Sequence, residues 1–199
     1  MVRCGIVHHS VPIPALTHLE ATAIQVTMTS KIHAAYLSPS CPLIRADLSA
    51  CFGGVMPVLM AGDLNAKHVD WNSRLNTRWG KLLRDYADGN SCLIFGQDTP
   101  TTNPYNPLAT PDVLDIVITK NLASSMYLTS CSTLSSDHLP VLLTLCVAYP
   151  SSTHWIALIS GALTGPTSKL TWKIKFRSIR NYTTGWQLTR ALRTSPAPS

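Results

Sequence analysis

An acid and an amide stand two residues apart in the segment Gly62-Asp63-Leu64-Asn65, which directly follows an apolar run at residues 57–61. Because side chains alternate along a strand, residues at this spacing can point to the same side. Asp63 could orient or deprotonate a water, and Asn65 could donate a hydrogen bond to a phosphate oxygen. Gly62 would let the backbone turn at the strand end. The spacing favours phosphoryl-transfer chemistry, although Asp and Asn are also common in ordinary turns.

A second acid, Asp115, lies in a strand-like run that is otherwise apolar, residues 113–118. A bare carboxylate in such a strand is costly unless it is paired. His138 is the candidate partner, because a carboxylate fixes the imidazole tautomer while the other ring nitrogen faces a substrate. Backbone amides that satisfy Asp115 are the alternative. Asp137, next to His138, could bind a metal or cap the turn.

Strands and helices alternate in the elements that must position these residues. The sequence predicts helices at residues 43–51 and 79–86, the second after a cap at Asn76 or Thr77. The proline-rich segment 96–111 predicts a loop long enough to cross a site. Together with the strands, this pattern predicts a layered α/β or α+β fold. The predicted strands lie at residues 5–13, 21–28, 32–37, 57–61, 92–95, 112–119, 126–131 and 140–145.

The composition fits one folded domain, because 199 residues with 45% hydrophobic content can bury a substantial core. The six cysteines include no Cys-x-x-Cys pair, and no amino-terminal apolar run resembles a signal peptide. We therefore expect reduced thiols and an intracellular protein. The longest membrane-like stretch, residues 155–163, falls short of the roughly 20 apolar residues of a spanning helix, so no membrane span is expected.

The net charge of +6 is unevenly distributed along the chain. All ten acids precede Leu139, whereas seven Lys and Arg residues and no acid follow it. Periodicity is lost after Val147, and the sequence therefore predicts one domain over residues 1–146 and a weakly structured tail over residues 147–199. The basic tail is a candidate anchor for nucleic acid. The alternative is that a segment under no selection for structure has acquired the same composition by chance.

Three motifs in order resemble the endonuclease/exonuclease/phosphatase superfamily. They are residues 62–68 (Gly-Asp-Leu-Asn-Ala-Lys-His), 111–118 (Pro-Asp-Val-Leu-Asp-Ile-Val-Ile) and 136–141 (Ser-Asp-His-Leu-Pro-Val). Within this superfamily, the sequences of the three motifs are most similar to the apurinic-endonuclease-like domain of jockey-type non-long-terminal-repeat retrotransposons. The segments at residues 34–39 and 72–74 fit the same pattern, and the resemblance covers about residues 5–145.

The resemblance implies an α/β fold, a four-layer α/β sandwich of two packed mixed β-sheets flanked by helices. It implies phosphodiester hydrolysis that nicks DNA at a target site, in a protein of the nucleus that belongs to a reverse transcriptase polyprotein. It also implies a role for each site residue. Asp63 would activate the water, Asn65 and Tyr36 would contact the phosphate, His138 oriented by Asp115 would stabilise its charge, and Asp137 would help to hold Mg²⁺.

One part of the family pattern is not found. The family carries an Asn and a metal-binding Glu on first strands that precede the segment matched from Gly5 onward, so we expect a fold without those strands and an incomplete Mg²⁺ site. Glu20, which is the only Glu, is either a replacement ligand or an exposed acid at a strand start. The sequence thus leaves two functions open. One is an endonuclease domain, as an incomplete remnant, and the other is an inactive nucleic-acid-binding protein that uses the basic tail.

Overall fold

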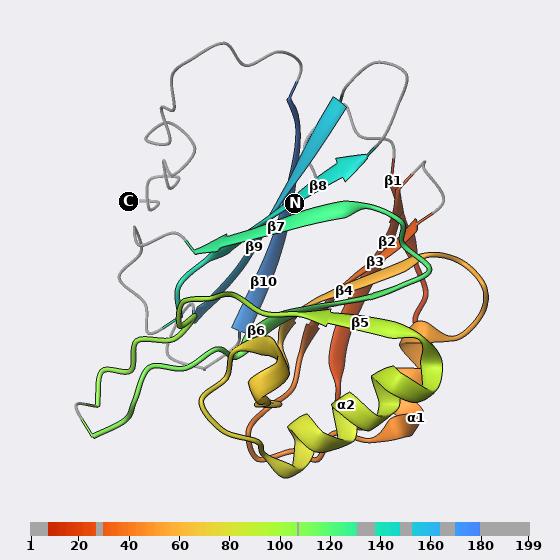
Figure 1. The fold of residues 1–199 in the computed structure, drawn as a ribbon. Coiled ribbons are helices and arrows are strands. Elements are labelled where there is room, and N and C mark those ends of the chain that lie inside the picture. Colours follow the sequence, from red (N-terminus) through yellow and green to blue (C-terminus); the bar gives the residue numbers. More distant parts are fainter. Residues whose placement is uncertain are drawn as a thin grey trace, which may run out of the picture.

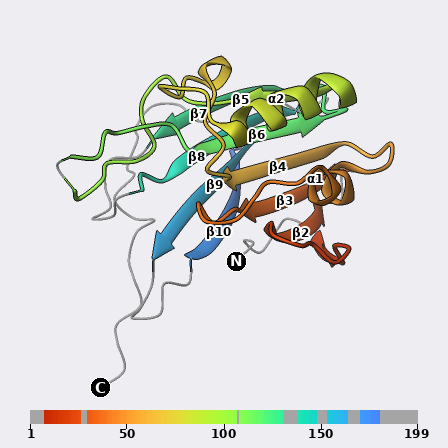
Figure 2. The same ribbon diagram turned by 90° about the horizontal axis from the view of Figure 1, so that it is seen from below.

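The computed structural model describes residues 8–26, 30–106, 108–130, 138–147, 153–163 and 170–179. Two β-sheets pack face to face, and helices cover the outer side of one of them (Figures 1 and 2). The expected α/β class with two packed sheets is confirmed. Within the described ranges the helices lie on one side, so these residues form three layers of the expected four. None of the helices in this part of the chain is long and apolar enough to span a membrane.

The larger sheet has six strands in the order β1-β2-β3-β4-β6-β5. It is mixed, because β3 and β4 run parallel while the other neighbours are antiparallel. Its strands are β1 (His8–Val11), β2 (Glu20–Val26), β3 (Ser30–Tyr36), β4 (Val58–Asp63), β5 (Cys92–Phe95) and β6 (Asp115–Lys120).

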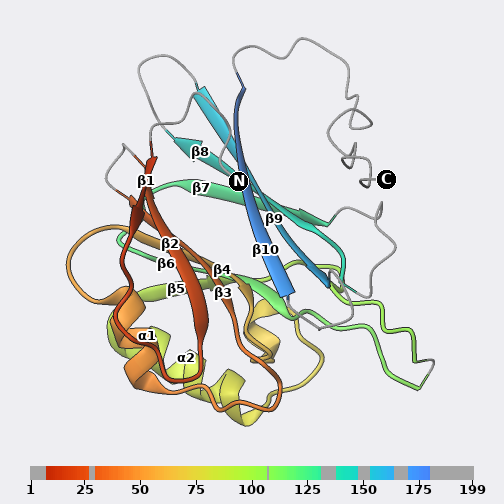
Figure 3. The ribbon, with the colours of Figure 1, turned by 180° about the vertical axis from the view of Figure 1, so that it is seen from behind.

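The smaller sheet is antiparallel throughout, with four strands in the order β10-β9-β8-β7. The strands are β7 (Ser125–Ser130), β8 (Val141–Val147), β9 (Thr153–Leu163) and β10 (Leu170–Ile179). Seen from behind, β9 and β10 cross the larger sheet, and they contact β4 and β3 respectively (Figure 3).

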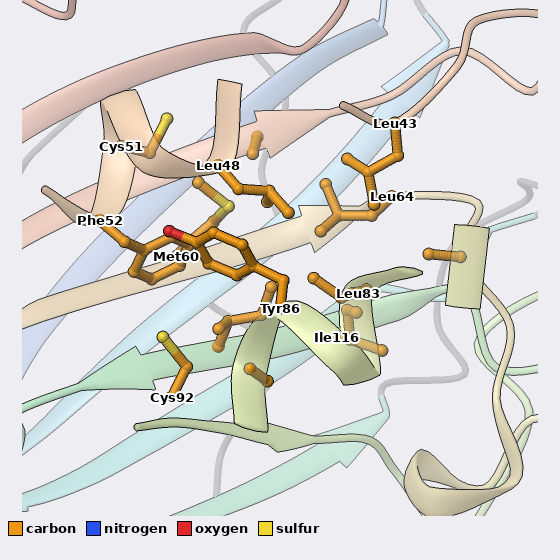
Figure 4. Close-up of a cluster of buried hydrophobic side chains, with 14 of the residues drawn as sticks. Leu43, Leu48, Cys51, Phe52, Met60, Leu64, Leu83, Tyr86, Cys92 and Ile116 are labelled. Atoms are coloured by element: carbon orange, nitrogen blue, oxygen red, sulfur yellow. The ribbon is translucent and has the colours of Figure 1, made fainter. Parts of the chain in front are cut away.

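The helices are α1 (Arg45–Phe52) and α2 (Arg78–Asn90), and a 3-10 turn, η1 (Val69–Trp71), precedes α2. Thr77 caps α2 as predicted, because its hydroxyl accepts the N–H of Gly80 at 3.1 Å. Leu83 and Tyr86 on α2 pack with Phe52 of α1 over the larger sheet (Figure 4). The predicted helical spacing of these apolar residues is therefore their core face.

Strand β4 is buried along its whole length and contributes to two cores. Val58 and Met60 belong to the cluster under the helices, whereas Leu59 and Ala61 belong to the cluster between the two sheets. Because strand side chains alternate, the next residue in the second series is Asp63. The strand therefore carries Asp63 to the inter-sheet side, at the end of the sheet.

Two differences from the sequence-based elements concern the sheets. Strands β9 and β10, which the sequence does not predict, lie beyond residue 147, and residues 153–163 and 170–179 continue the smaller sheet. Strand β6 begins at Asp115, later than the expected residue 112, because Asp112 forms an isolated bridge with Thr102 in the preceding loop. The domain boundary near residue 147 stays a prediction.

Candidate active site

Four residues form one row across the end of the larger sheet. The register pairs Glu20 with Tyr36, Tyr36 with Asp63, and Asp63 with Asp115. Directly paired residues of neighbouring strands lie side by side on the same face. The structure thus brings Tyr36, Asp63 and Asp115 of the predicted site together at one edge and places Glu20 at the end of their row.

Gly62 has a role in this row that differs from the expected turn. Strand β4 continues through Asp63, and Gly62 has a φ of +152°. A Cβ atom at this position would lie 1.8 Å from the carbonyl oxygen of Ala35 on β3. Glycine is therefore required because the backbones of β3 and β4 approach closely next to Asp63.

His138 lies between the two carboxylates. Its Nε2 is 3.7 Å from Oδ2 of Asp63, and its Nδ1 is 3.3 Å from Oδ2 of Asp115. Both carboxylates are almost fully buried, with 2% of Asp63 and 5% of Asp115 exposed. The structure therefore places His138 and Asp115 in contact, which is the pairing that the sequence suggests for a carboxylate in an apolar strand.

Burial and the charge of Asp115 raise the pKa of Asp63, while His138 and hydrogen bonding by Asn65 act in the opposite direction. The Asp63 Oδ1 accepts the backbone N–H of Asn65 at 2.9 Å. Burial and the nearby charge of Asp63 also raise the pKa of Tyr36. The Tyr36 phenol is thus held in its protonated form, in which it can donate a hydrogen bond.

Asn65 is held by its own backbone conformation and by a hydrogen bond to the residue that follows β3. It has a left-handed φ of 47°, a conformation that Asn tolerates better than most residues. Its Nδ2 donates to the carbonyl oxygen of Leu37 at 2.9 Å. The Asn65 side chain also hydrogen-bonds to the Asp63 carboxylate, so the amide is held beside the acid.

The described residues of this site include side chains of the type that binds Mg²⁺, but too few of them to form a metal site. Carboxylate oxygens are the ligands that Mg²⁺ prefers. Within the described part of the chain, however, no group of three or more His, Cys, Asp or Glu side chains could hold a metal ion. Asp137, the expected ligand, lies outside the described residues, so its metal role stays a prediction.

A family model described as endonuclease-reverse transcriptase matches residues 30–142. The match covers more than half of the 199 residues and includes Tyr36, Asp63, Asp115 and His138. The chain belongs to the endonuclease-reverse transcriptase family. The resemblance to endonuclease domains of jockey-type elements that the motifs indicate is thereby confirmed.

Members of the family from Drosophila melanogaster are similar to this chain. The RNA-directed DNA polymerase from mobile element jockey is 33% identical over 130 residues, which cover 64% of this chain and 14% of that protein. The probable RNA-directed DNA polymerase from transposon BS is 25% identical over 151 residues, which cover 72% of this chain and 16% of that protein. The chain therefore spans a small part of the length of these relatives.

A solved structure supports the fold of this family member. The endonuclease domain of TRAS1, a telomere-specific non-LTR retrotransposon, matches with a TM-score of 0.54 at 19% identity. The match covers 70% of this chain and 66% of the TRAS1 domain. At this identity the likeness concerns the fold alone, and it confirms the α/β arrangement.

Sequence reasoning missed a set of buried residues beside the site. Asp112 is 2% exposed, pairs with Nζ of Lys67 at 2.9 Å and accepts the backbone N–H of Arg74 at 2.9 Å. Thr101 is fully buried and binds the backbone at Asp115. Asp112 and Thr101 lie in a segment that reads as loop or strand start, and nothing in the sequence separates a buried polar loop residue from an exposed one.

Proposed function

We propose that this chain is a divalent-metal-dependent DNA endonuclease domain that nicks target DNA for a mobile element. The observation that carries the proposal is the His138 imidazole between the buried carboxylates of Asp63 and Asp115. This arrangement lies at the end of the two packed sheets in a chain whose family is defined by endonucleases. It places a proton acceptor, Asp63, next to an oriented imidazole, that of His138. Phosphodiester hydrolysis needs a base for the attacking water and a donor for the phosphate charge.

Asp63 would orient the attacking water and accept its proton. The pKa of its carboxyl is raised toward neutral pH, and a general base works best when its pKa lies near the working pH. The hydrogen bond from the Asn65 N–H holds Oδ1, and Oδ2 is the oxygen that faces His138. Asp63 is therefore positioned by its own loop before substrate binds.

His138 would donate a hydrogen bond to the phosphate. Asp115 contacts Nδ1, so Nε2, on the side of Asp63, is the nitrogen directed to the reaction. The side-chain amide of Asn65 and the protonated phenol of Tyr36 would donate to phosphate oxygens. Donors at these positions match the charge that grows on the phosphate.

Endonuclease domains of this family generally depend on a divalent metal. We propose Mg²⁺, with Asp137 as one ligand and Glu20 as a possible replacement for the Glu of the family pattern. A bound metal would supply Lewis-acid stabilisation of phosphate charge. Because the described residues do not complete a ligand set, no step of the mechanism is assigned to it.

One loop beside the site carries exposed side chains that suit a large substrate. The loop between β5 and β6 reaches the site through a bridge between Thr102 and His138. The same loop carries Tyr105 and Leu108, which are 77% and 91% exposed. Exposed apolar side chains on a loop that is anchored at the site provide contact area for a macromolecule, so we propose DNA as the substrate. The chain would then act in the nucleus, within a polyprotein that includes a reverse transcriptase.

The test is nicking of supercoiled plasmid by the purified chain with Mg²⁺. We expect nicked circles, abolished by EDTA and reduced at least 100-fold by Asp63→Ala or His138→Ala, on the scale of lost general-base catalysis. Asp85→Ala and His9→Ala, at exposed positions outside the site, are the matched controls and should nick as the unchanged chain does.

Two results would contradict the proposal. A folded chain that nicks no DNA with Mg²⁺ or Mn²⁺ would reject the endonuclease function and support the incomplete-remnant hypothesis. Salt-sensitive DNA binding without nicking, lost on deletion of residues 150–199, would instead favour a nucleic-acid-binding protein that uses the basic tail.

A further inference from the structure

The loop between β5 and β6 contains one fully buried residue with an unusual set of backbone contacts, Thr101. Its hydroxyl oxygen accepts the backbone N–H groups of Leu114 at 2.9 Å and of Asp115 at 3.1 Å. These two groups lie at the start of β6, next to the carboxylate that contacts His138. Thr101 therefore holds the backbone from which the Asp115 side chain projects.

The main chain of Thr101 holds the other partner of the pair. Its carbonyl oxygen accepts the backbone N–H of Leu139 at 2.7 Å, and the neighbouring Thr102 forms a β-bridge with His138. His138 precedes β8 and is outside every named strand, so no strand ladder fixes its backbone. The bond from the Leu139 N–H to Thr101 and the bridge at Thr102 therefore constrain the backbone at His138.

Thr101 is itself anchored from the opposite side. Its N–H donates to the carbonyl oxygen of Asp112 at 2.9 Å, and the Thr102 N–H donates to the same oxygen at 3.1 Å. The Asp112 carboxylate in turn accepts the N–H of Arg74 and pairs with Lys67. The loop that follows Asn65 is thereby joined through Asp112 to the residue that holds Asp115 and His138.

We propose that Thr101 is a positioning residue that sets the separation of the Asp115 carboxylate and the His138 imidazole. The inference deepens the proposed endonuclease function and rests on it for its effect on rate, but the geometric part stands apart from activity. A buried hydroxyl that accepts two N–H groups cannot be replaced by a methyl without leaving both unsatisfied. The start of β6 would then shift relative to the segment at Leu139, and the contact at Nδ1 would loosen.

The experiment compares Thr101→Val, which keeps the shape and removes the hydroxyl, with Thr101→Ser, which keeps the hydroxyl. Thr77→Val is a matched control, because the Thr77 hydroxyl also accepts two backbone N–H groups, those of Lys67 and Gly80, both at 3.1 Å. The readout is the ¹⁵N spectrum of the His138 imidazole in the full chain at one fixed pH, without metal. This signal reports whether Nδ1 keeps its carboxylate partner.

We expect the Nδ1 signal to change in Thr101→Val and to stay as in the unchanged chain in Thr101→Ser and Thr77→Val. If the chain nicks DNA, Thr101→Val should lower the nicking rate about 10- to 100-fold at unchanged DNA affinity, since small misplacements of catalytic groups have effects of this size. Should Thr101→Val not fold, Thr101→Ala serves as the second variant, because it removes the hydroxyl without placing a new methyl group there.

An unchanged Nδ1 signal in a folded Thr101→Val or Thr101→Ala chain would overturn the inference. So would an equal change in Thr77→Val, because the effect would then not be specific to the Thr101 hydroxyl. A chain that nicks no DNA but shows the expected imidazole changes would reject the proposed function and leave the positioning role supported.

Discussion

At the end of the larger sheet, two carboxylates contact a single imidazole, so the acidic groups outnumber the basic group that could neutralise them. Asp63 and Asp115 are direct cross-strand partners, so their like charges repel at short range in a buried setting. His138 offsets part of this repulsion. A site arranged in this way stores unfavourable electrostatic energy that a phosphate-bound cation or a proton can release, which is common where side chains must change protonation state.

Replacement of Asp63 should therefore stabilise the fold at alkaline pH. The folded-state pKa of Asp63 is raised above its ordinary value of 3.8, mainly by burial, so native stability falls as the pH rises through that pKa. We expect Asp63→Asn to increase the free energy of unfolding by about 1 kcal/mol or more at pH 8, with little change at pH 3.5. Urea unfolding in EDTA measures it, and Asp85→Asn on the exposed side of α2 is the control; an equal gain at both pH values would contradict the assignment.

His33 is a buried titratable residue that lies outside the site. It is 3% exposed on β3, and neither ring nitrogen has a hydrogen-bond partner among the described residues. Burial, together with the charge of Lys31, lowers the pKa of His33 from 6.5 to about 4. The folded chain thus keeps this imidazole neutral at pH values where the unfolded chain protonates it.

Stability should fall as the pH drops from about 6.5 toward 4, because the unfolded state binds the extra proton in this window. Between pH 7.5 and pH 5 we expect His33 to account for about 2 kcal/mol of the loss. Comparison of urea unfolding at these two pH values for the unchanged chain, His33→Leu and the exposed control His9→Leu isolates the effect. If His33→Leu loses as much stability on acidification as the unchanged chain, another group is responsible.

At the scale of elements, the close approach of β3 and β4 positions the acid of the site. The pair runs parallel, and Tyr36 and Asp63 come to the same level because their strands end together. Gly62 makes this possible, since a side chain there would meet the carbonyl oxygen of Ala35. The glycine before Asp63 is therefore a requirement of strand packing, and the Gly-Asp order in the motif has a structural cause.

Gly62→Ala should destabilise the chain by about 3 kcal/mol or more, because the new Cβ overlaps the backbone of β3 and the φ of +152° disfavours a side chain. Gly89→Ala is the matched change, since a Cβ at this position on α2 meets nothing within 4 Å. It should stabilise the chain by about 0.5–1 kcal/mol through helix propensity. Thermal unfolding of both variants decides the point, and a Gly62→Ala chain as stable as the unchanged chain would refute the packing argument.

For the whole molecule, the strands beyond residue 147 complete the smaller sheet. Strand β9 pairs with β8 along its length, from Val141 with Ile159 to Val147 with Thr153. Leu143 and Leu145 of β8 belong to the core between the sheets. Strand β9 therefore covers the edge of β8, and β8 contributes to the core between the sheets.

A chain ending at residue 147 should be less stable than the full chain and should tend to associate through the free edge of β8. The urea midpoint and the elution volume in size-exclusion chromatography measure the two effects. The full-length variant Leu158→Pro interrupts β9 opposite Leu142. It should lower the urea midpoint in the same direction, because it also weakens the pairing of β9 with β8. An unchanged midpoint in the short chain would instead support a domain boundary near residue 147.

The sequence alone determined the secondary structure around the site. Apolar runs ending in Asp63 and surrounding Asp115 mark buried strands because their periodicity and bounding turn residues are local properties. The capped and amphipathic pattern from Thr77 to Tyr86 likewise defines α2. The order of the three motifs, which needs no structure, indicated the family that the comparisons confirm.

Only the tertiary structure decided how these pieces meet. The register that aligns Glu20, Tyr36, Asp63 and Asp115 depends on pairing between strands far apart in the chain, and no local pattern specifies such pairing. Burial of Thr101, and the strands that follow residue 147, also depend on what packs against them. Local chemistry thus fixed which residues can act, whereas long-range packing fixed their distances, their protonation and the neighbours that hold them.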